Sequence, residues 1–333
     1  MKKIIFASLL FLGTTATLAY ASVPEIVDTT YVQEALKHGA IIWDVRSADD
    51  YKKGHIPGAV NIGDAGKVLR DENSEDYIEQ EKIEKILGNA GIDPSKEVIV
   101  YGSKGNPFVY FSLLTIQYFG GQNASVYHGG IDDWTASGQP ASTEASVLAP
   151  VQLNNKVNAA VTMSTADVLK SLKNKNVQIL DVRTSKEFSG EDIRALRGGH
   201  IPGAMNIPFE QNWVDPEAPK KLEKKEVANK DGLALKSRDQ LKALYANLNQ
   251  DKETIVYCQS GVRAAETATV LKDLGFKKVK VYDSSWLGYG NNLSAPAQNV
   301  NYFNVGALNG KLGAMQKRIE MLEKQLAEAK TAK

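Results

Sequence analysis

The chain has 333 residues, which is long enough for two domains that each bury a hydrophobic core. Its 40 basic and 39 acidic residues leave a net charge of +1, so charge gives no basis for binding nucleic acid or an anionic surface. One cysteine excludes an internal disulfide, and four scattered histidines without CxxC, HExxH or glycine-rich phosphate-binding patterns argue against metal or nucleotide chemistry. We therefore expect no metal and no cofactor.

The first 21 residues have the order of a secretory signal. Met1–Lys3 is basic, residues 4–12 are apolar but too few to span a bilayer, and small residues precede Ala21. We expect cleavage after Ala21 and export, with a bacterial periplasm as the destination. No later stretch has the length and apolarity of a membrane span.

The rest of the chain repeats itself once. Ile42–Arg46, with the sequence IWDVR, is followed by Gly54–Ile62, which reads GHIPGAVNI. Ile179–Arg183, with the sequence ILDVR, is followed by Gly199–Ile207, which reads GHIPGAMNI. A single repeat with a period above one hundred residues indicates a duplicated domain rather than a solenoid.

Each copy continues through a polar helical stretch to a short, β-branched strand, Val98–Tyr101 or Thr254–Tyr257. A loop, a helix and another short strand follow in both copies. Strands that alternate with helices predict parallel sheets flanked by helices. We predict two such α/β domains, over residues 22–145 and 160–298, joined by a linker over residues 146–159.

Cys258 lies where a reactive thiol would be built, between the strand Thr254–Tyr257 and a helix expected over residues 264–274. A thiol in this position faces unpaired backbone N–H groups and the positive end of a helix dipole, and both favour the reactive thiolate. Gly102 stands at the same place in the first copy and offers no nucleophile. We therefore predict that the second domain carries the covalent chemistry and that the first is inert.

These motifs together resemble the tandem-domain rhodanese sulfurtransferases. The resemblance covers roughly residues 28–298 and rests on the repeated segments above, the loop Tyr257–Arg263, and the segments Gly129–Trp134 and Ser284–Asn291. It implies two rhodanese-like domains. It also implies that Cys258 takes a sulfane sulfur from a donor as a persulfide and passes it to a nucleophilic acceptor, such as a thiol or a cyanide-like molecule.

The loop after Cys258 would then bind the sulfur. Backbone N–H groups from Gln259 to Arg263 would stabilise charge on the terminal sulfur, and Gly261 would permit a conformation that a side chain obstructs. Ser260 could donate a further hydrogen bond, and Arg263 could bind a small anionic donor such as thiosulfate. Val262 completes the predicted substrate-binding loop. The alternative for Arg263 is a solvated position in the first turn of the helix.

The resemblance also implies a place near the substrate for Arg183. However, Arg46 occupies the same position in the inert copy, and each arginine has an acid four residues later, Asp50 or Glu187. A structural ion pair is therefore an equal alternative for Arg183.

Other features that recur in both copies are expected to serve the fold. Asp44 corresponds to Asp181, and His55 corresponds to His200. A buried histidine that bonds to a nearby loop is the ordinary explanation for such a pair.

Two departures from the family pattern bear on the donor. Relatives that act on 3-mercaptopyruvate usually have a loop resembling Cys-Gly-Ser-Gly-Val-Thr and an arginine where this chain has Glu187, whose carboxylate would repel a carboxylate substrate. The familiar loop with two basic residues is also absent, because Gln259 and Ser260 are neutral. We therefore expect thiosulfate or polysulfide as the donor.

Two alternatives to a sulfurtransferase stay open. Cysteine-dependent phosphatases separate their cysteine and arginine by five residues, whereas four residues separate Cys258 from Arg263. The shorter loop should fit a single sulfur better than a tetrahedral oxyanion. The other alternative is a sulfur-carrier or scaffold module that does not turn over small molecules.

Two segments fall outside the repeat. Residues 190–197 are an insertion in the second copy that could rim the active-site mouth, although a solvated surface loop is the simpler expectation. Residues 299–333 form a tail with apolar residues alternately four and three positions apart, which is a heptad seam: Leu308, Leu312, Met315, Ile319, Leu322 and Leu326. We expect a helix that forms a homo-oligomer through residues 305–329, and folding back onto a domain is the alternative.

Overall fold

The computed structural model describes residues 23–154 and 156–331, so the predicted signal segment lies outside the described residues. The first copy of the repeat forms five strands and six helices within this part of the chain. They are β1 (Ile26–Val27), α1 (Thr29–Lys37), β2 (Ile41–Asp44), α2 (Ala48–Lys53), β3 (Val60–Asn61), α3 (Ala65–Val68), α4 (Gln80–Asn89), β4 (Val98–Tyr101), α5 (Phe108–Tyr118), β5 (Ala124–Tyr127) and α6 (Gly130–Ala136).

The second copy repeats this order of elements and adds short helices before its fourth strand, β9. Its elements are β6 (Thr162–Met163), α7 (Thr165–Ser171), β7 (Val177–Asp181), α8 (Ser185–Ser189), β8 (Met205–Asn206), the 3₁₀ helix η1 (Phe209–Asn212), α9 (Ala218–Glu223), the 3₁₀ helix η2 (Asp231–Leu233), α10 (Arg238–Leu244), β9 (Glu253–Tyr257), α11 (Val262–Asp273), β10 (Val279–Tyr282) and α12 (Ser285–Asn291). The long helix α13 (Val305–Thr331) follows.

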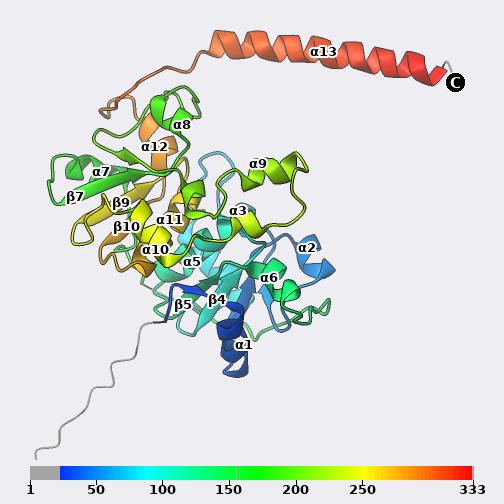
Figure 1. Ribbon diagram of the computed structural model, residues 1–333, viewed down its shortest axis with the longest axis vertical. Coiled ribbons are helices and arrows are strands. Elements are labelled where there is room, and N and C mark those ends of the chain that lie inside the picture. The colour runs from blue at the N-terminus through cyan, green and yellow to red at the C-terminus, as the bar shows by residue number, and fades with distance from the viewer. Residues whose placement is uncertain (1–22, 155, 332–333) are drawn as a thin grey trace, which may run out of the picture.

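The two copies have the same sheet topology. The strand order is β1-β5-β4-β2-β3 in the first sheet and β6-β10-β9-β7-β8 in the second, and every pair of neighbouring strands is parallel. Helices flank both sheets (Figure 1). The predicted fold, two α/β domains with parallel sheets and a C-terminal helix, is confirmed.

Strands β4 and β9 are the buried central strands of the two sheets. All four residues of β4 are buried, and so are the last four residues of β9. Their runs of valine, isoleucine and tyrosine suit a parallel strand that is covered on both faces. Because the carboxyl end of each strand leads directly into a loop and a helix, Gly102 and Cys258 lie at equivalent edges of the two sheets.

The two domains share one hydrophobic core. Helix α5 is apolar nearly all round, and it packs against α11 of the second domain. Phe111 of the first domain and Ala265 of the second belong to the same cluster of buried residues. A hydrogen bond of 2.7 Å from Lys272 Nζ to Gln117 Oε1 also crosses this interface. The active-site loop is therefore built on a joint core of the two domains.

The recurrent histidines have the structural roles expected of them. His200 stacks on Phe188 with ring centroids 3.7 Å apart, and its Nδ1 lies 2.9 Å from the carbonyl oxygen of Phe188. His55 stacks on Tyr51 at the same distance, and its Nδ1 lies 2.8 Å from the carbonyl oxygen of Tyr51. These pairs hold the glycine–histidine segment against the preceding helix in both copies.

Helix α13 extends away from both domains (Figure 1). Its side chains from Val305 to Glu328 are all exposed. The alternative in which this helix folds back onto a domain is therefore wrong, because packing against a domain would bury its apolar stripe. In the part of the chain that the structure describes, no helix is long and apolar enough to cross a membrane.

Candidate active site

Cys258 begins a tight loop between β9 and α11. Gly261 ends that loop with φ of +84°, a backbone conformation that favours glycine. A Cβ at Gly261 would also lie 2.4 Å from Oδ1 of Asp283, so a side chain has no room there. The predicted need for glycine is thus explained by both the dihedral angle and the close approach of the neighbouring strand end.

The side chain of Ser285 fixes the conformation of this loop through hydrogen bonds to its backbone. Its Oγ accepts hydrogen bonds of 3.0 Å from the backbone N–H groups of Cys258 and Gly261 and donates one of 2.7 Å to the carbonyl oxygen of Tyr282. Ser285 adopts φ of +49°, which is uncommon for a residue with a side chain. The three hydrogen bonds offset the cost of that conformation.

This arrangement corrects one sequence expectation. The N–H of Gly261 bonds to Ser285, so it does not face the sulfur position as predicted. For the N–H groups of Gln259, Ser260, Val262 and Arg263, the described part of the chain provides no hydrogen-bond acceptor. They are the donors that stay available to an anionic sulfur. Sequence reasoning missed Ser285, although comparison of the copies contains the signal, since Gly130 occupies its place in the first domain.

Cys258 lines a cavity of about 540 Å³ between the two domains. The predicted binding loop contributes four residues to its lining: Gln259, Ser260, Val262 and Arg263. The first domain forms the opposite wall with residues that the sequence did not single out, including Lys67, Arg70, Glu72, Glu75 and Phe108. The thiol itself is almost fully buried, so access to its sulfur is through this cavity.

Arg70 reaches from the first domain to the active-site loop. Its Nη2 donates a 2.6 Å hydrogen bond to the carbonyl oxygen of Ser260, and its guanidinium carbon lies 4.8 Å from the ring centroid of Phe111. Its Nη1 is 3.8 Å from Oδ1 of Asp283. Burial raises the pKa of Asp283 to about 7, although the charge of Arg70 opposes that rise. The nominally inert domain therefore places a buried cation against the loop that carries the nucleophile.

Arg263 is ion-paired with Glu187. Its Nη1 and Nη2 each donate a 2.8 Å hydrogen bond to a different carboxylate oxygen, a bidentate geometry. Burial alone would raise the pKa of Glu187, but the hydrogen bonds and charge of Arg263 outweigh it and lower that pKa to about 2. The alternative of a solvated Arg263 is wrong, because most of its side chain is buried and the guanidinium is paired.

The same ion pair corrects our argument about the donor. Glu187 was expected to repel a carboxylate substrate, but its charge is balanced by Arg263 and by Arg194, whose Nη1 lies 3.3 Å away. A neutralised carboxylate repels an anion weakly, so Glu187 does not by itself argue against 3-mercaptopyruvate.

The insertion belongs to the cavity wall. Arg194 lines the cavity, and its carbonyl oxygen accepts a 2.7 Å hydrogen bond from Nε2 of Gln259. Arg197 is buried and donates to the carbonyl oxygens of Asn292 and Ala295 at 2.9 and 2.8 Å. The expectation of a plain surface loop was therefore wrong, because the insertion is held in place next to the site.

Arg183 has a structural environment. Its Nε and Nη2 donate to the carboxylate of Asp181, and Nη2 also donates to the carbonyl oxygen of Gly199 at 2.7 Å. Arg46 makes the same contacts in the first domain, with Asp44 and Gly54. Arg183 is buried and is absent from the cavity wall. These contacts support the ion-pair alternative over a substrate contact. The partner is Asp181, not the predicted Glu187.

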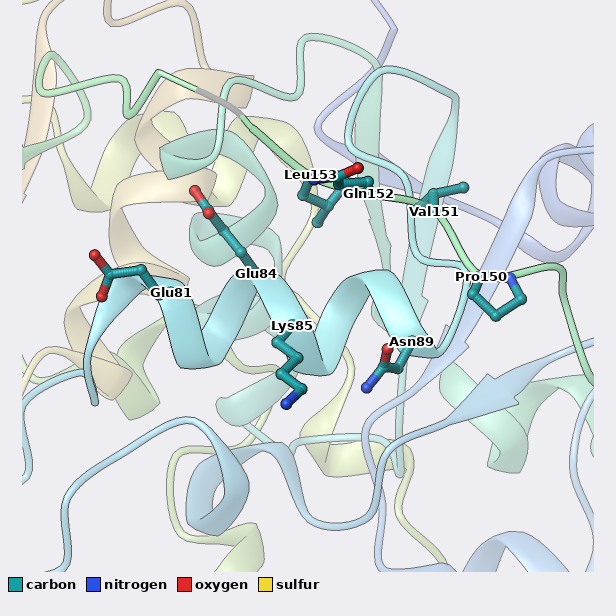
Figure 2. A pocket seen from close by; sticks show the side chains of 8 residues that line it. All are labelled: Glu81, Glu84, Lys85, Asn89, Pro150, Val151, Gln152 and Leu153. Atoms are coloured by element: carbon teal, nitrogen blue, oxygen red, sulfur yellow. The ribbon is translucent and has the colours of Figure 1, made fainter.

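Another hollow of about 410 Å³ lies between α4 and residues 150–153. Figure 2 shows that Glu81, Glu84 and Lys85 point in different directions from the helix and do not converge on a common point. This surface offers no nucleophile. Among residues 23–154 and 156–331, no cluster of histidine, cysteine or acidic side chains could hold a metal ion.

Comparison with known proteins identifies the family. The family described as "Rhodanese-like domain" matches residues 28–137 and, a second time, residues 164–292. The chain belongs to the rhodanese family. Both copies of the repeat are thus rhodanese domains, and the cysteine loop lies in the second of them.

Relatives of this rhodanese have named activities. It is 36% identical over 260 residues to the thiosulfate sulfurtransferase of Corynebacterium glutamicum, across 74% of this chain and 81% of the relative. It is 31% identical over 298 residues to the sulfur carrier protein TtuD of Thermus thermophilus, across 84% of this chain and 98% of the relative. This rhodanese is a sulfurtransferase.

A solved structure agrees with the fold. SseA of Escherichia coli, described as a 3-mercaptopyruvate sulfotransferase, matches with a TM-score of 0.65 and 28% identity, across 79% of this chain and 99% of SseA. Helix α13 begins after the second rhodanese match ends at residue 292.

Proposed function

We propose that the protein transfers sulfane sulfur from thiosulfate or polysulfide, through a persulfide on Cys258, to a thiophilic acceptor such as a thiol or cyanide. The observation that carries this proposal is the position of Cys258. It is buried in the wall of an interdomain cavity, and four N–H groups of the loop that follows it are available to an anion. The thiosulfate sulfurtransferase relative supports thiosulfate as the first donor to test.

In the first half-reaction the Cys258 thiolate attacks the outer sulfur of thiosulfate. A bond forms between Sγ and that sulfur, the sulfur–sulfur bond of thiosulfate breaks, and sulfite leaves with the bonding electron pair. The N–H groups of Gln259 and Ser260 would stabilise the negative charge on the terminal sulfur. With polysulfide the same attack releases a polysulfide that is one sulfur shorter.

In the second half-reaction the acceptor attacks the terminal sulfur of the persulfide. A bond forms between acceptor and sulfur, the Sγ–sulfur bond breaks, and Cys258 leaves as the thiolate that started the cycle. Cyanide gives thiocyanate by this route, and a thiolate gives a new persulfide. The starting thiolate requires no additional base, because the leaving group restores it.

The cavity walls favour an anionic donor at their buried end. Arg70 is buried in the cavity wall, whereas Glu72 and Glu75 are exposed. Arg263 adds no net charge, because Glu187 balances it. A buried cation attracts an anion more strongly than an exposed carboxylate repels it, since water screens the exposed charge. Sequence features of residues 1–21 support an exported site of action, which we also propose.

The decisive test is thiocyanate formation from thiosulfate and cyanide, with intact mass recorded after thiosulfate alone. We expect turnover and one added sulfur in the mature protein, and neither in Cys258→Ser. A persulfide that forms without turnover on cyanide or small thiols would support the sulfur-carrier alternative. If thiosulfate and polysulfide both fail to load sulfur onto Cys258, the proposal is wrong.

A further inference from the structure

Helix α13 presents a continuous apolar seam that is left exposed by residues 23–154 and 156–331. The exposed fractions of Leu312, Met315 and Leu326 are 52%, 61% and 56%. Large apolar side chains at heptad spacing on a fully exposed helix are unusual, because water penalises them and nothing in the fold requires them. The seam starts after the second rhodanese match, so it is not needed to complete either domain.

The seam has the residue pattern of a two-stranded coiled coil. In heptad notation, Val305, Leu312, Ile319 and Leu326 occupy the a positions, and Leu308, Met315 and Leu322 occupy the d positions. β-branched residues at a, combined with leucine at d, favour two parallel strands, and the first and third heptads have this combination. Three heptads are marginal alone, so a cognate partner strand is needed to stabilise the helix.

The glycines of α13 avoid the seam. Gly306, Gly310 and Gly313 fall at the b and f positions, on the outer face of the helix. Glycine weakens a helix wherever it occurs, but at these positions it removes no interhelical contact. The seam is therefore intact over its whole length even where the helix itself is weakest.

Charges at the edges of the seam specify a parallel pair. In a parallel in-register coiled coil, Arg318 at position g faces Glu323 at position e of the partner helix, and symmetry gives two such pairs. In an antiparallel pair, g positions face g positions. Those positions hold Lys311, Arg318 and Gln325, so cations would meet cations. The parallel arrangement is thus the one with complementary charge.

We propose that two copies of this chain pair through α13 as a parallel, in-register, two-stranded coiled coil. The segment before α13 fixes where the two bodies lie. Gln298 pairs with His200 and Tyr302 pairs with Arg197 in antiparallel bridges, so the chain is held against the second domain until three residues before α13 begins. Pairing from residue 305 onwards then brings together the second domains of two copies, next to the insertion that contributes Arg194 to the cavity.

The first experiment is the mass of the full mature chain in solution, measured under reducing conditions across a concentration series. We expect twice the monomer mass for the wild type, and the monomer mass for Ile319→Lys and for a chain ending at residue 304. Lys317→Glu, on the outer face, is the matched control and should keep the dimer. A wild type that is monomeric at about 100 μM, or that has three times the monomer mass, would overturn the proposal.

Two further variants test the orientation. Arg318→Glu should weaken the dimer by roughly tenfold in dissociation constant, and adding Glu323→Arg should restore it, because the double swap recreates both pairs. In a Cys258→Ser background, Leu322→Cys should form a disulfide between two copies, since identical d positions face each other only in a parallel pair. A dimer in which Leu322→Cys stays reduced under oxidising conditions would show that the orientation is wrong.

Discussion

The loops that follow β4 and β9 occupy the same place in two copies of one fold, yet only the second carries a nucleophile that opens onto a cavity. Gly102 stands where the second domain has Cys258, and Gly130 stands where it has Ser285. Gly130 and Ser285 share the left-handed conformation, with φ of +57° and +49°. The backbone was thus preserved through the duplication, and the side chains that act on sulfur occur in one copy alone.

In the first domain, the loop that follows β4 is covered by residues of the second domain. A Cβ at Gly105 would lie 2.7 Å from Cδ1 of Leu233, which shows how tightly Leu233 packs over that loop. Lys104 is paired with Asp133 at 2.7 Å. Lys230 of the second domain pairs with Asp132 at 2.9 Å and completes the closure.

The first domain supports the loop that follows β9 in the second domain, but it leaves the cavity beside that loop open. Arg70 holds the carbonyl of Ser260, and Phe108 lines the cavity wall. The comparison shows that a domain without a nucleophile can still form part of an active site. It also predicts which substitutions should change sulfur transfer or stability and which should leave both unchanged.

The largest effect is expected from an attempt to move the nucleophile between the loops. Gly102→Cys in a Cys258→Ser background should leave sulfur transfer at least about a thousandfold below wild type. Leu233 covers that loop, and the supporting serine cannot be added, because a Cβ at Gly130 would lie 2.2 Å from the carbonyl oxygen of Gly102.

Thiocyanate formation and intact mass after thiosulfate measure the outcome of this exchange. The wild type and Cys258→Ser, assayed beside the double variant, set the upper and lower limits of sulfur loading. One added sulfur on the double variant, whose sole thiol is the one introduced at position 102, would contradict the prediction.

The next largest effect is expected from the buried ion pair between Glu187 and Arg263, compared with the exposed pair between Asp50 and Lys53. Glu187→Gln should destabilise the protein by about 3 kcal/mol, since it leaves the mostly buried Arg263 without its partner. Asp50→Asn, at the corresponding position of the first domain, should change stability little, because Asp50 pairs with Lys53 on the exposed surface. Urea unfolding of both variants makes the comparison, and equal losses would contradict it.

The same pair predicts a pH dependence. The pKa of Glu187 is lowered from 4.5 to about 2 in the folded protein, so its contribution to stability is fully present above pH 4.5. That contribution is lost as the pH falls from 4.5 towards 2. Glu187→Gln should therefore lose less stability than wild type over this interval. Parallel slopes for the two proteins in urea unfolding would show that another group is responsible.

A smaller effect is expected from the support that the first domain lends to the loop. Arg70→Ala should slow sulfur uptake by Cys258 about tenfold. The substitution removes the charged hydrogen-bond donor, the Arg70 guanidinium, that holds the carbonyl oxygen of Ser260 in place. Arg70→Lys should fall between this variant and wild type. Arg238→Ala, which removes a surface arginine paired with Asp273, is the matched control and should leave the rate unchanged. Rapid-quench intact mass measures the uptake rate, and a wild-type rate in Arg70→Ala would limit the first domain to a packing role.

The smallest effects should separate the two roles of Ser285. Ser285→Gly copies the first domain, loses the hydrogen bonds to Cys258 and Gly261, and should lower activity several-fold. Ser285→Ala loses the same bonds but keeps a Cβ at positive φ, so it should be about 1 kcal/mol less stable than the glycine variant. Activity and urea unfolding are measured together. An alanine variant as stable as the glycine variant would show that the dihedral angle costs little.

Much of this molecule is determined by its sequence. The β-branched runs Val98–Tyr101 and Thr254–Tyr257 predict their strands because burial on both faces of a parallel sheet demands apolar residues at every position. The repeat predicts two domains with one topology, and the single cysteine at a strand end predicts the nucleophile. These features depend on local pattern and on hydrophobic periodicity, which are properties of short stretches of chain.

The tertiary structure decided what surrounds the nucleophile. Arg70 and Ser260 are 190 residues apart in sequence, and Glu187 and Arg263 are 76 apart, so no local pattern indicates that they meet. Arg183 and Arg263 both looked suited to bind an anion, and the fold pairs each of them with a carboxylate. A charge acts through its distance and its burial, and both are set only when the two domains pack together.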